Sequence, residues 1–231
     1  MVHNVPMRLV LASASPARRA TLIAAGITPI VRVSTVDEEA VLAALPGGRA
    51  FSGGATTPAD EVAALAAAKC ADVCEALAQG DSELPEGDPV LVVGCDSMLE
   101  IDSQMLGKPH TPEVARERIR AMRRTSATLW TGHSAAILAP ASSTDGRTGT
   151  RTVSASVTRS ASTQVHFGDI SDAEIDAYVA TGEPLHVAGS FTVDGLGGPF
   201  IEGVTGDYHS VVGISLPLLR SMASELGVFW P

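Results

Sequence analysis

Positive charge is scarce in this sequence, and lysine is the scarcest of the common charged residues. The chain of 231 residues has 16 lysines and arginines against 26 acidic side chains, for a formal net charge of -10. Lys69 and Lys108 are its only lysines. Nonspecific nucleic-acid binding draws most of its energy from Lys and Arg on phosphates, so this balance excludes an extended basic surface. Any polyanionic ligand must therefore meet a local cationic site.

Cysteine and long apolar runs are also scarce. Cys70, Cys74 and Cys95 are an odd number and too few for a disulfide framework, which favours a reducing compartment and, by default, the cytoplasm. The spacing of Cys70 and Cys74 suits a metal half-site, but no second pair or nearby His completes it, so buried apolar roles are favoured. No apolar run approaches the roughly 20 residues that cross a bilayer, which predicts a soluble protein with no membrane partner.

The common nucleotide and hydrolase motifs are missing. No stretch matches G-x-x-x-x-G-K-[ST], and the glycines between Asp194 and Gly198 do not fit G-x-G-x-x-G. Neither G-x-S-x-G nor H-E-x-x-H occurs. A P-loop, a dinucleotide fold and the hydrolases built on those two motifs are therefore unsupported.

What is present is an alternation of strand-like and helix-like segments. With 45% hydrophobic residues the chain can bury a sizeable core. Ser or Thr before Pro predicts three helix starts, at Ser15, Thr57 and Thr111, and Ser171 to Glu174 is a capping box for a fourth. Helices are expected at 16–25, 58–77, 112–123, 172–181 and 216–226. Strands are expected at 7–12, 29–33, 90–95, 98–101, 128–130, 135–139 and 200–204, with one long or two short strands in 153–167.

This order predicts an α/β fold with a mixed sheet, because hairpins around Asp102 and within 142–150 accompany the strand–helix alternation. Three segments look loose, at 46–56, 79–88 and 141–150. None of them is long enough to mark an interdomain linker. We therefore expect residues 1–231 to form a single domain, with two lobes around one sheet left open.

The first segment that suits chemistry runs from Leu11 to Arg19. A strand leads into a turn with the hydroxyls of Ser13 and Ser15, followed by a helix N-terminus and Arg18. Free amides at a helix N-terminus favour an anion, and Arg adds bidentate hydrogen bonds, so a phosphate cradle is one interpretation. The alternative is an ordinary capped helix with exposed arginines.

The second segment is the apolar run from Val90 that ends at Asp96 and Ser97. Such a run predicts a strand buried on both faces, and open α/β sheets place ligands beyond the carboxyl ends of strands. Asp96 could bind a divalent cation or accept a proton from water, or it could simply form a turn.

The remaining candidates are the two lysines and an acidic segment. Lys69 lies late in an Ala-rich helical stretch, and Lys108 lies between Gly107 and Pro109 in a tight turn. Either lysine could instead be an exposed solubilising residue. Residues 37–39, Asp-Glu-Glu, could hold a metal or form a solvated acidic turn, and the sequence leaves open whether Glu38 or Glu39 faces a site.

Taken together, these segments resemble the Maf-like proteins, and the resemblance spans nearly the whole chain. No single motif is decisive, but many short motifs occur in the family's order. They are Leu11 to Arg19, Asp37-Glu38, Leu65 to Lys69, Gly94-Cys95-Asp96, Gly107-Lys108-Pro109, Thr131-Gly132, Tyr178 to Pro184, and Gly206-Asp207-Tyr208 with Val211 to Gly213.

The resemblance implies a nucleoside triphosphate pyrophosphatase, a hydrolase that cuts the α-β phosphoanhydride to give a nucleoside monophosphate and pyrophosphate. It implies an elongated mixed sheet flanked by helices, with two lobes and a central cleft, and a divalent metal cofactor, Mg²⁺ or Mn²⁺. A homodimer is left open. By motif, Ser13, Arg18, Lys69 and Lys108 would bind substrate, Glu38 and Asp96 would bind metal, and Asp96 would be the catalytic proton acceptor.

The chain departs from the family pattern at several positions. Ala17 replaces the first of two arginines that commonly follow Ser-Pro, so Arg19 is an alternative source of that phosphate contact. Ser97 replaces a Thr, Asp194 replaces a Gln, and His186-Val187 replaces Asp-Lys, which leaves the base of the nucleotide open. The alternative function is a nucleotide-binding regulator of cell division, or septum formation, with little turnover.

Overall fold

The computed structural model describes residues 8–79, 84, 88–140 and 150–230. Its centre is one mixed sheet with the order β2-β1-β3-β5-β6-β7, in which β4 pairs with β3. β1 is parallel to β2 and β3, and the other pairings are antiparallel. The described strands are β1 Arg8–Ala12, β2 Ile30–Val31, β3 Val90–Ile101, β4 Gln104–Leu106, β5 Ser126–Ala139, β6 Thr152–Phe167 and β7 Ile201–Thr205.

Seven α-helices and three short 3-10 helices accompany the sheet in the described part of the chain. The α-helices are α1 Pro16–Ala24, α2 Glu38–Ala43, α3 Pro58–Ala78, α4 Pro112–Met122, α5 Asp172–Ala180, α6 Tyr208–Val212 and α7 Leu216–Glu225. The 3-10 helices are η1 Glu183–His186, η2 Ala188–Ser190 and η3 Gly198–Phe200. The Ser-Pro and Thr-Pro helix starts are confirmed, because Ser15, Thr57 and Thr111 each cap a helix through the side chain. The capping box at Ser171 is confirmed as well.

The strand predictions need correction in two places. The breaks predicted near Asp96 and between Trp130 and Ala135 do not exist, since β3 and β5 each run through without interruption. These strands pair with each other from Val90 opposite Leu138 to Glu100 opposite Thr128. The polar and small residues that suggested breaks are therefore held extended by pairing with a neighbouring strand, which outweighs local propensity.

The shorter predicted elements can also be compared with the structure. The predicted hairpin around Asp102 joins β3 to β4, with positive φ at Asp102 and Ser103. The region 153–167 is one long strand, β6. Asp37 caps α2, and Glu38 and Glu39 are its first residues, so this segment is not a free turn. The short helix α6 was not predicted at all. Most of the loose segments at 79–88 and 141–150, and the hairpin within the second, fall outside the described residues.

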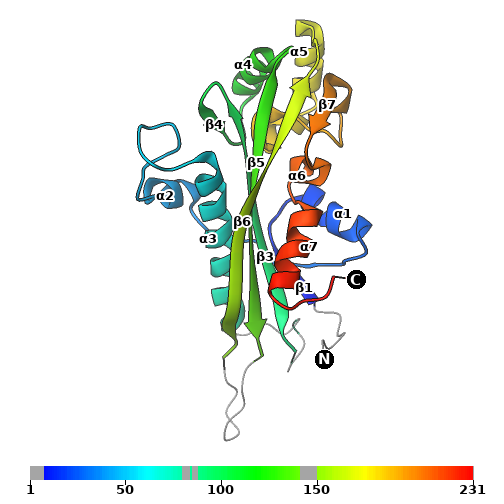
Figure 1. Ribbon diagram of the computed structural model, residues 1–231. Coiled ribbons are helices and arrows are strands. Elements are labelled where there is room, and N and C mark those ends of the chain that lie inside the picture. The colour runs from blue at the N-terminus through cyan, green and yellow to red at the C-terminus, as the bar shows by residue number, and fades with distance from the viewer. Residues whose placement is uncertain (1–7, 80–83, 85–87, 141–149, 231) are drawn as a thin grey trace, which may run out of the picture.

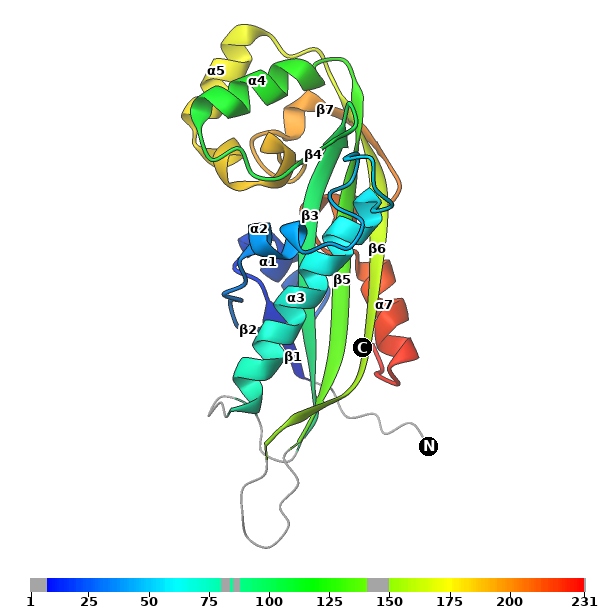
Figure 2. The same cartoon turned by 90° about the vertical axis from the view of Figure 1, so that its left-hand side faces the viewer.

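The lower half of the sheet lies between two layers of helices (Figure 1). Alternate strand residues such as Val10, Val92 and Ala136 pack in one core with α3. Their neighbours, such as Leu11 and Val93, pack in another core with α1 and α7. The upper half of the long strands carries α4 and α5, which Figure 2 shows grouped at the far end of an elongated molecule. The predicted α/β class, an elongated mixed sheet flanked by helices, is confirmed.

Two glycines allow α3 to lie directly on the sheet. A Cβ atom at Gly132 would lie 2.0 Å from the carbonyl oxygen of Val62, and one at Gly94 would lie 2.4 Å from that of Ala66. Both contacts are with helix backbone, which no side-chain rotation relieves. The close approach brings the α3 residue Lys69 within reach of β3.

We expect Gly132→Ala to lower the free energy of unfolding by about 2 kcal/mol or more, because α3 must move off the sheet. Urea unfolding followed by circular dichroism measures this difference. Gly203→Ala is the control, because its Cβ would make an ordinary 3.5 Å contact with His166, and it should stay within about 0.5 kcal/mol of the parent. Equal midpoints for all three proteins would contradict the close contact.

Candidate active site

The candidate site lies where one edge of β3 has no strand beside it. β1 pairs with β3 only as far as Ala12 opposite Gly94, and β4 begins only at Leu106 opposite Leu99. Among the described strands, none pairs with this edge from Cys95 to Met98. Asp96 was expected just beyond the end of a strand, but it lies inside β3, at the point where β1 ends.

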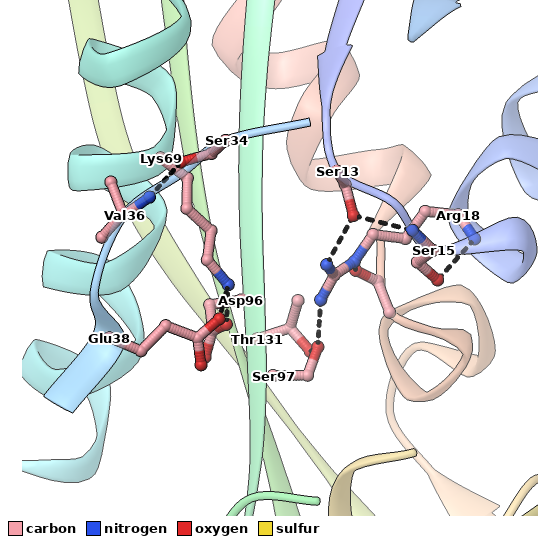
Figure 3. A network of polar contacts seen from close by, with 11 residues as sticks. Ser13, Ser15, Arg18, Ser34, Val36, Glu38, Lys69, Asp96, Ser97 and Thr131 are labelled. Carbon is pink, nitrogen blue, oxygen red and sulfur yellow. Dashed lines mark hydrogen bonds and ion pairs between the residues drawn. The ribbon is translucent and has the colours of Figure 1, made fainter. Parts of the chain in front are cut away.

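Asp96 and Ser97 point to opposite faces of the sheet at this gap (Figure 3). Asp96 faces α3, and Ser97 faces α1. Each of the two residues belongs to a separate cluster of polar side chains, so the site has two halves on either side of β3.

The first half joins Asp96, Lys69 and Glu38. The Nζ atom of Lys69 donates to Oδ1 of Asp96 at 2.6 Å and lies 2.7 Å from Oε1 of Glu38. The side chains of Lys69 and Asp96 are 14% and 10% exposed, whereas that of Glu38 is 53% exposed. One buried ammonium therefore bridges two carboxylates, and the cluster carries a net negative charge.

The surroundings shift the pKa values of these two carboxylates in opposite directions, up for Asp96 and down for Glu38. Burial raises the pKa of Asp96, against the charges of Lys69 and Arg18 and the hydrogen bond from Lys69. Burial also acts to raise the pKa of Glu38, but the hydrogen bond and charge of Lys69, with smaller effects of Lys108 and Arg18, lower it below the usual value. Glu38 is accordingly the more firmly ionised of the pair.

Local structure places Glu38 toward this cluster and Glu39 away from it. Asp37 caps α2 by accepting a hydrogen bond from the Ala40 amide at 3.1 Å, which makes Glu38 the first residue of the helix. Leu42 anchors α2 in a core with Val62 and Leu65 of α3. Glu39 is 86% exposed and lies 3.7 Å from Arg49, so Glu38 is the glutamate that faces the site.

The second half centres on Arg18, whose guanidinium is held by three groups. Nε donates to the carbonyl of Gly213 at 2.7 Å, Nη1 donates to Oγ of Ser13 at 3.0 Å, and Nη2 donates to Oγ of Ser97 at 3.1 Å. A guanidinium has five N–H donors, so one on each terminal nitrogen remains for a ligand. Two parallel donors at fixed positions suit a phosphate or carboxylate.

Ser13 and Ser15 shape the turn that leads into α1. The Ser15 amide donates to Oγ of Ser13 at 3.2 Å, and the side chain of Ser15 accepts from the Arg18 amide. Ser13 is buried beside Arg18 and so contributes to the site, whereas Ser15 caps the helix. Both interpretations of this segment, cradle and capped helix, therefore describe parts of the same turn.

Lys108 approaches the site from the connection between β4 and α4. Its side chain is exposed and forms no hydrogen bond or ion pair with a described residue. The turn beneath it is fixed, because the carbonyl of Gly107 accepts from Arg118 Nη1 at 2.9 Å and from the Gly189 amide at 3.2 Å. The positive charge of Lys108 helps to lower the pKa of Glu38, as does that of Arg18.

Several supporting residues were not assigned a role from the sequence. Thr131 on β5 lies 3.0 Å from Ser97, oxygen to oxygen, and donates to the carbonyl of Ser210 at 3.0 Å. His133, fully buried on the same strand, accepts a hydrogen bond from the Ser215 amide at 2.8 Å. These contacts join β5 to the segment from Ser210 to Ser215, whose Gly213 carbonyl holds Arg18. The only indication of them in the sequence was that Thr131 and Gly213 belong to family motifs.

Comparison with known proteins shows the family of the chain. The family model described as "Maf-like protein" matches residues 8–226. The chain belongs to the Maf-like family.

Curated relatives resemble nearly the full length of this Maf-like chain. A protein from Nocardia farcinica is 51% identical over 95% of this chain and 93% of its own length. One from Saccharopolyspora erythraea is 50% identical over 96% and 94%, and one from Streptomyces coelicolor is 48% identical over 95% and 91%. Each of the three is named nucleoside triphosphate pyrophosphatase.

The departures from the Maf-like pattern fall in α1 at Ala17, in β3 at Ser97 and in the segment from η1 to η3. The side chain of Arg18 takes part in the network beside α1, while the side chain of Arg19 is exposed and makes no hydrogen bond or ion pair with a described residue. His186, Val187 and Asp194 lie in the loop from η1 to η3. That loop is tied to Lys108's turn through the hydrogen bond from the Gly189 amide to Gly107.

No helix in the described part of the chain is long and apolar enough to cross a membrane. A polar hollow lined by residues such as Arg124, His166 and Asp169 lies at the far end of β5 and β6. It contains none of the predicted site residues, which gather at the β3 gap instead.

The buried His133 predicts a dependence of stability on pH. Its burial, with the charge of Arg18, lowers its pKa from 6.5 to about 4. Because the unfolded chain takes up a proton first, stability is complete above about pH 6.5 and is lost as pH falls toward 4, by about 3 kcal/mol. Urea unfolding at pH 7 and pH 4.5 measures the loss.

His133→Gln is the control for this prediction, because an amide oxygen can accept the Ser215 hydrogen bond without titrating. Other groups also titrate in this range, so the informative quantity is the difference between parent and variant. An equal loss of stability in both proteins would show that His133 stays protonated or is not buried as described.

Proposed function

We propose that the chain is a nucleoside triphosphate pyrophosphatase that hydrolyses the α-β phosphoanhydride to give a nucleoside monophosphate and pyrophosphate. The observation that carries the proposal is the arrangement at the β3 gap. Arg18 presents two free N–H groups on one side of the strand, and Asp96 lies paired with Lys69 on the other. The names of the relatives support the same activity.

The cationic side chains around the gap, Arg18, Lys69 and Lys108, would bind the phosphate groups. Arg18 offers two donors already aimed by Ser13, Ser97 and Gly213, so little side-chain freedom is lost when an anion binds. Lys69 lies in the opposite half, and Lys108 extends from the fixed turn above it. Charges on several sides of a triphosphate would stabilise the negative charge that develops on the departing pyrophosphate.

The carboxylates fit a divalent metal that arrives with the substrate. The first half of the site has one ammonium and two carboxylates, so its net charge favours a further cation. Among the described residues no three His, Cys, Asp or Glu side chains form a metal-binding group. Mg²⁺ bound with nucleotides commonly uses one or two carboxylates together with phosphate oxygens. Glu38 and Asp96 can provide the carboxylates, and the substrate provides the phosphate oxygens. Bound there, Mg²⁺ or Mn²⁺ would neutralise phosphate charge.

Asp96 is the residue that we propose as proton acceptor. Its Oδ1 is held by Lys69, and its Oδ2 has no hydrogen-bond partner among the described residues. Burial raises its pKa, which makes the ionised carboxylate a better base. Water attacks the α-phosphorus, its proton passes to Oδ2, and the bridging oxygen leaves on pyrophosphate with the bonding electrons.

The three cysteines are free and buried, in agreement with a reducing compartment, and we propose the cytoplasm as the location. The substrate is the partner that the site requires. The base of that substrate depends on contacts beyond the phosphate groups, and three of the residues that replace the common family pattern, His186, Val187 and Asp194, lie in the segment tied to the turn of Lys108.

Pyrophosphate release from a panel of nucleoside triphosphates, with Mg²⁺ or Mn²⁺, tests the proposal. The panel includes the standard ribo- and deoxynucleotides and base-modified forms, and the identity of the monophosphate product is determined for each. We expect release of pyrophosphate, not phosphate, from at least one nucleotide. Tight nucleotide binding without release would instead support a regulator with little turnover.

Asp96→Asn should lower kcat by about 100-fold or more, because the amide cannot accept the proton. The variant should fold, since it is nearly isosteric and Lys69 keeps Glu38 as a partner. Pyrophosphate release is measured beside the melting temperature. Turnover close to the parent value would remove Asp96 from the mechanism.

Glu38 and Glu39 provide a matched pair for the metal. Glu38→Gln should raise the Mg²⁺ concentration that gives half-maximal activity by about tenfold or more, because one of two carboxylates is lost. Glu39→Gln should stay within about twofold, since Glu39 points toward Arg49. Metal titrations at saturating nucleotide measure both values, and identical curves for the two variants would contradict a metal role for Glu38.

A further inference from the structure

His133 is fully buried, yet both nitrogens of its ring have defined partners. Nε2 accepts from the Ser215 amide at 2.8 Å, and Nδ1 lies 3.2 Å from the carbonyl oxygen of Thr131. A backbone amide can only donate and a carbonyl can only accept, so the ring is neutral with its proton on Nδ1. A buried imidazole fixed in this way acts as a rigid link between β5 and Ser215.

The segment from Ser210 to Ser215 is attached to β5 at both ends. The carbonyl of Ser210 accepts from the Thr131 hydroxyl at 3.0 Å, and the amide of Ser215 donates to His133. Between these points the amides of Gly213 and Ile214 both donate to the carbonyl of His209, at 3.0 and 3.1 Å, which closes the turn.

This turn presents one group to the site, the carbonyl of Gly213, which accepts from Nε of Arg18 at 2.7 Å. Gly213 has a φ of +123°, and a Cβ atom there would lie 3.1 Å from Nε of Arg18. Glycine is therefore required both for the backbone conformation and for the approach of the guanidinium. One of the three contacts that hold Arg18 therefore comes from a turn about 195 positions later in the chain.

We propose that His133 is a positioning residue that fixes the guanidinium of Arg18 through the Ser215-to-Gly213 turn. The part of this inference that concerns phosphate rests on the proposed function. Without the acceptor at His133, the buried amide of Ser215 loses its partner, and the turn moves to find another. Arg18 then loses the fixed contact at Nε, and its two free N–H groups no longer hold one orientation.

Three variants separate this role from a general contribution to the core. His133→Leu removes the acceptor, whereas His133→Gln keeps an oxygen that can accept from Ser215. Leu77→Ala is the matched destabilised control, because Leu77 is buried in the core with α3 on the opposite face of the sheet. If His133→Leu does not fold, His133→Asn replaces it, since that shorter side chain keeps a donor near Thr131 but does not reach Ser215.

The first readout is the NMR signal of the Arg18 Nε–H group in the full chain, assigned by its disappearance in Arg18→Lys. We expect a shifted or exchange-broadened signal in His133→Leu and the parent signal in His133→Gln and Leu77→Ala. An unchanged signal in the folded His133→Leu variant would overturn the proposal. This readout needs no activity, so it decides the positioning role even if no nucleotide is hydrolysed.

The second readout is a double-mutant cycle on pyrophosphate release. His133→Leu should lower kcat/KM by roughly tenfold or more, and His133→Gln should stay within about threefold of the parent. In an Arg18→Ala background, His133→Leu should have no further effect, because both changes remove the same interaction. Losses that multiply in the double variant would overturn the proposal. Absence of release from the parent protein would count against the proposed function alone.

Discussion

The alternation of side chains along β3 is the constraint on which the site depends. Successive residues of a strand point to opposite faces, so Asp96 and Ser97 cannot serve the same cluster. Asp96 meets Lys69 of α3, and Ser97 meets Arg18 of α1. The two helices therefore act on one short stretch of strand from opposite sides, and the ligand position that we propose lies at the edge between them. A shift of β3 by one residue would exchange the two halves and leave both without partners.

Scarcity of positive charge takes on a different meaning in this arrangement. The formal charge of -10 excludes an extended basic surface, so a polyanionic ligand needs a local cationic site. Lys69 is buried in the first half of the site, and Lys108, on a fixed turn, acts through its charge on Glu38 of the same half. With Arg18 in the second half, both lysines and one arginine lie around the position where a triphosphate would bind, which gives a locally cationic site in an acidic protein.

Much of the fold was predictable because its signals are local. A serine or threonine directly before a proline, as in Ser15-Pro16 and Thr57-Pro58, marks a helix start, because its side chain accepts a hydrogen bond from an amide three residues later. The continuity of β3 through Asp96 was not predictable, since it depends on pairing with β5. Glu38, Lys69 and Asp96 were proposed through family resemblance and do meet in space. The roles of Thr131 and His133 stayed hidden, because hydrogen bonds to Ser210 and Ser215 leave no local pattern in the sequence.

The gap on β3 also bears on self-association. An open sheet edge exposes unpaired backbone groups and invites a strand from another molecule. Here the open stretch from Cys95 to Met98 is closed off by β1 on one side and by β4 on the other. It is too short to template a foreign strand, yet long enough for a small anion to lie against. The flanking strands thereby protect this edge from strand addition, and Cys95, Asp96 and Met98 along it are buried.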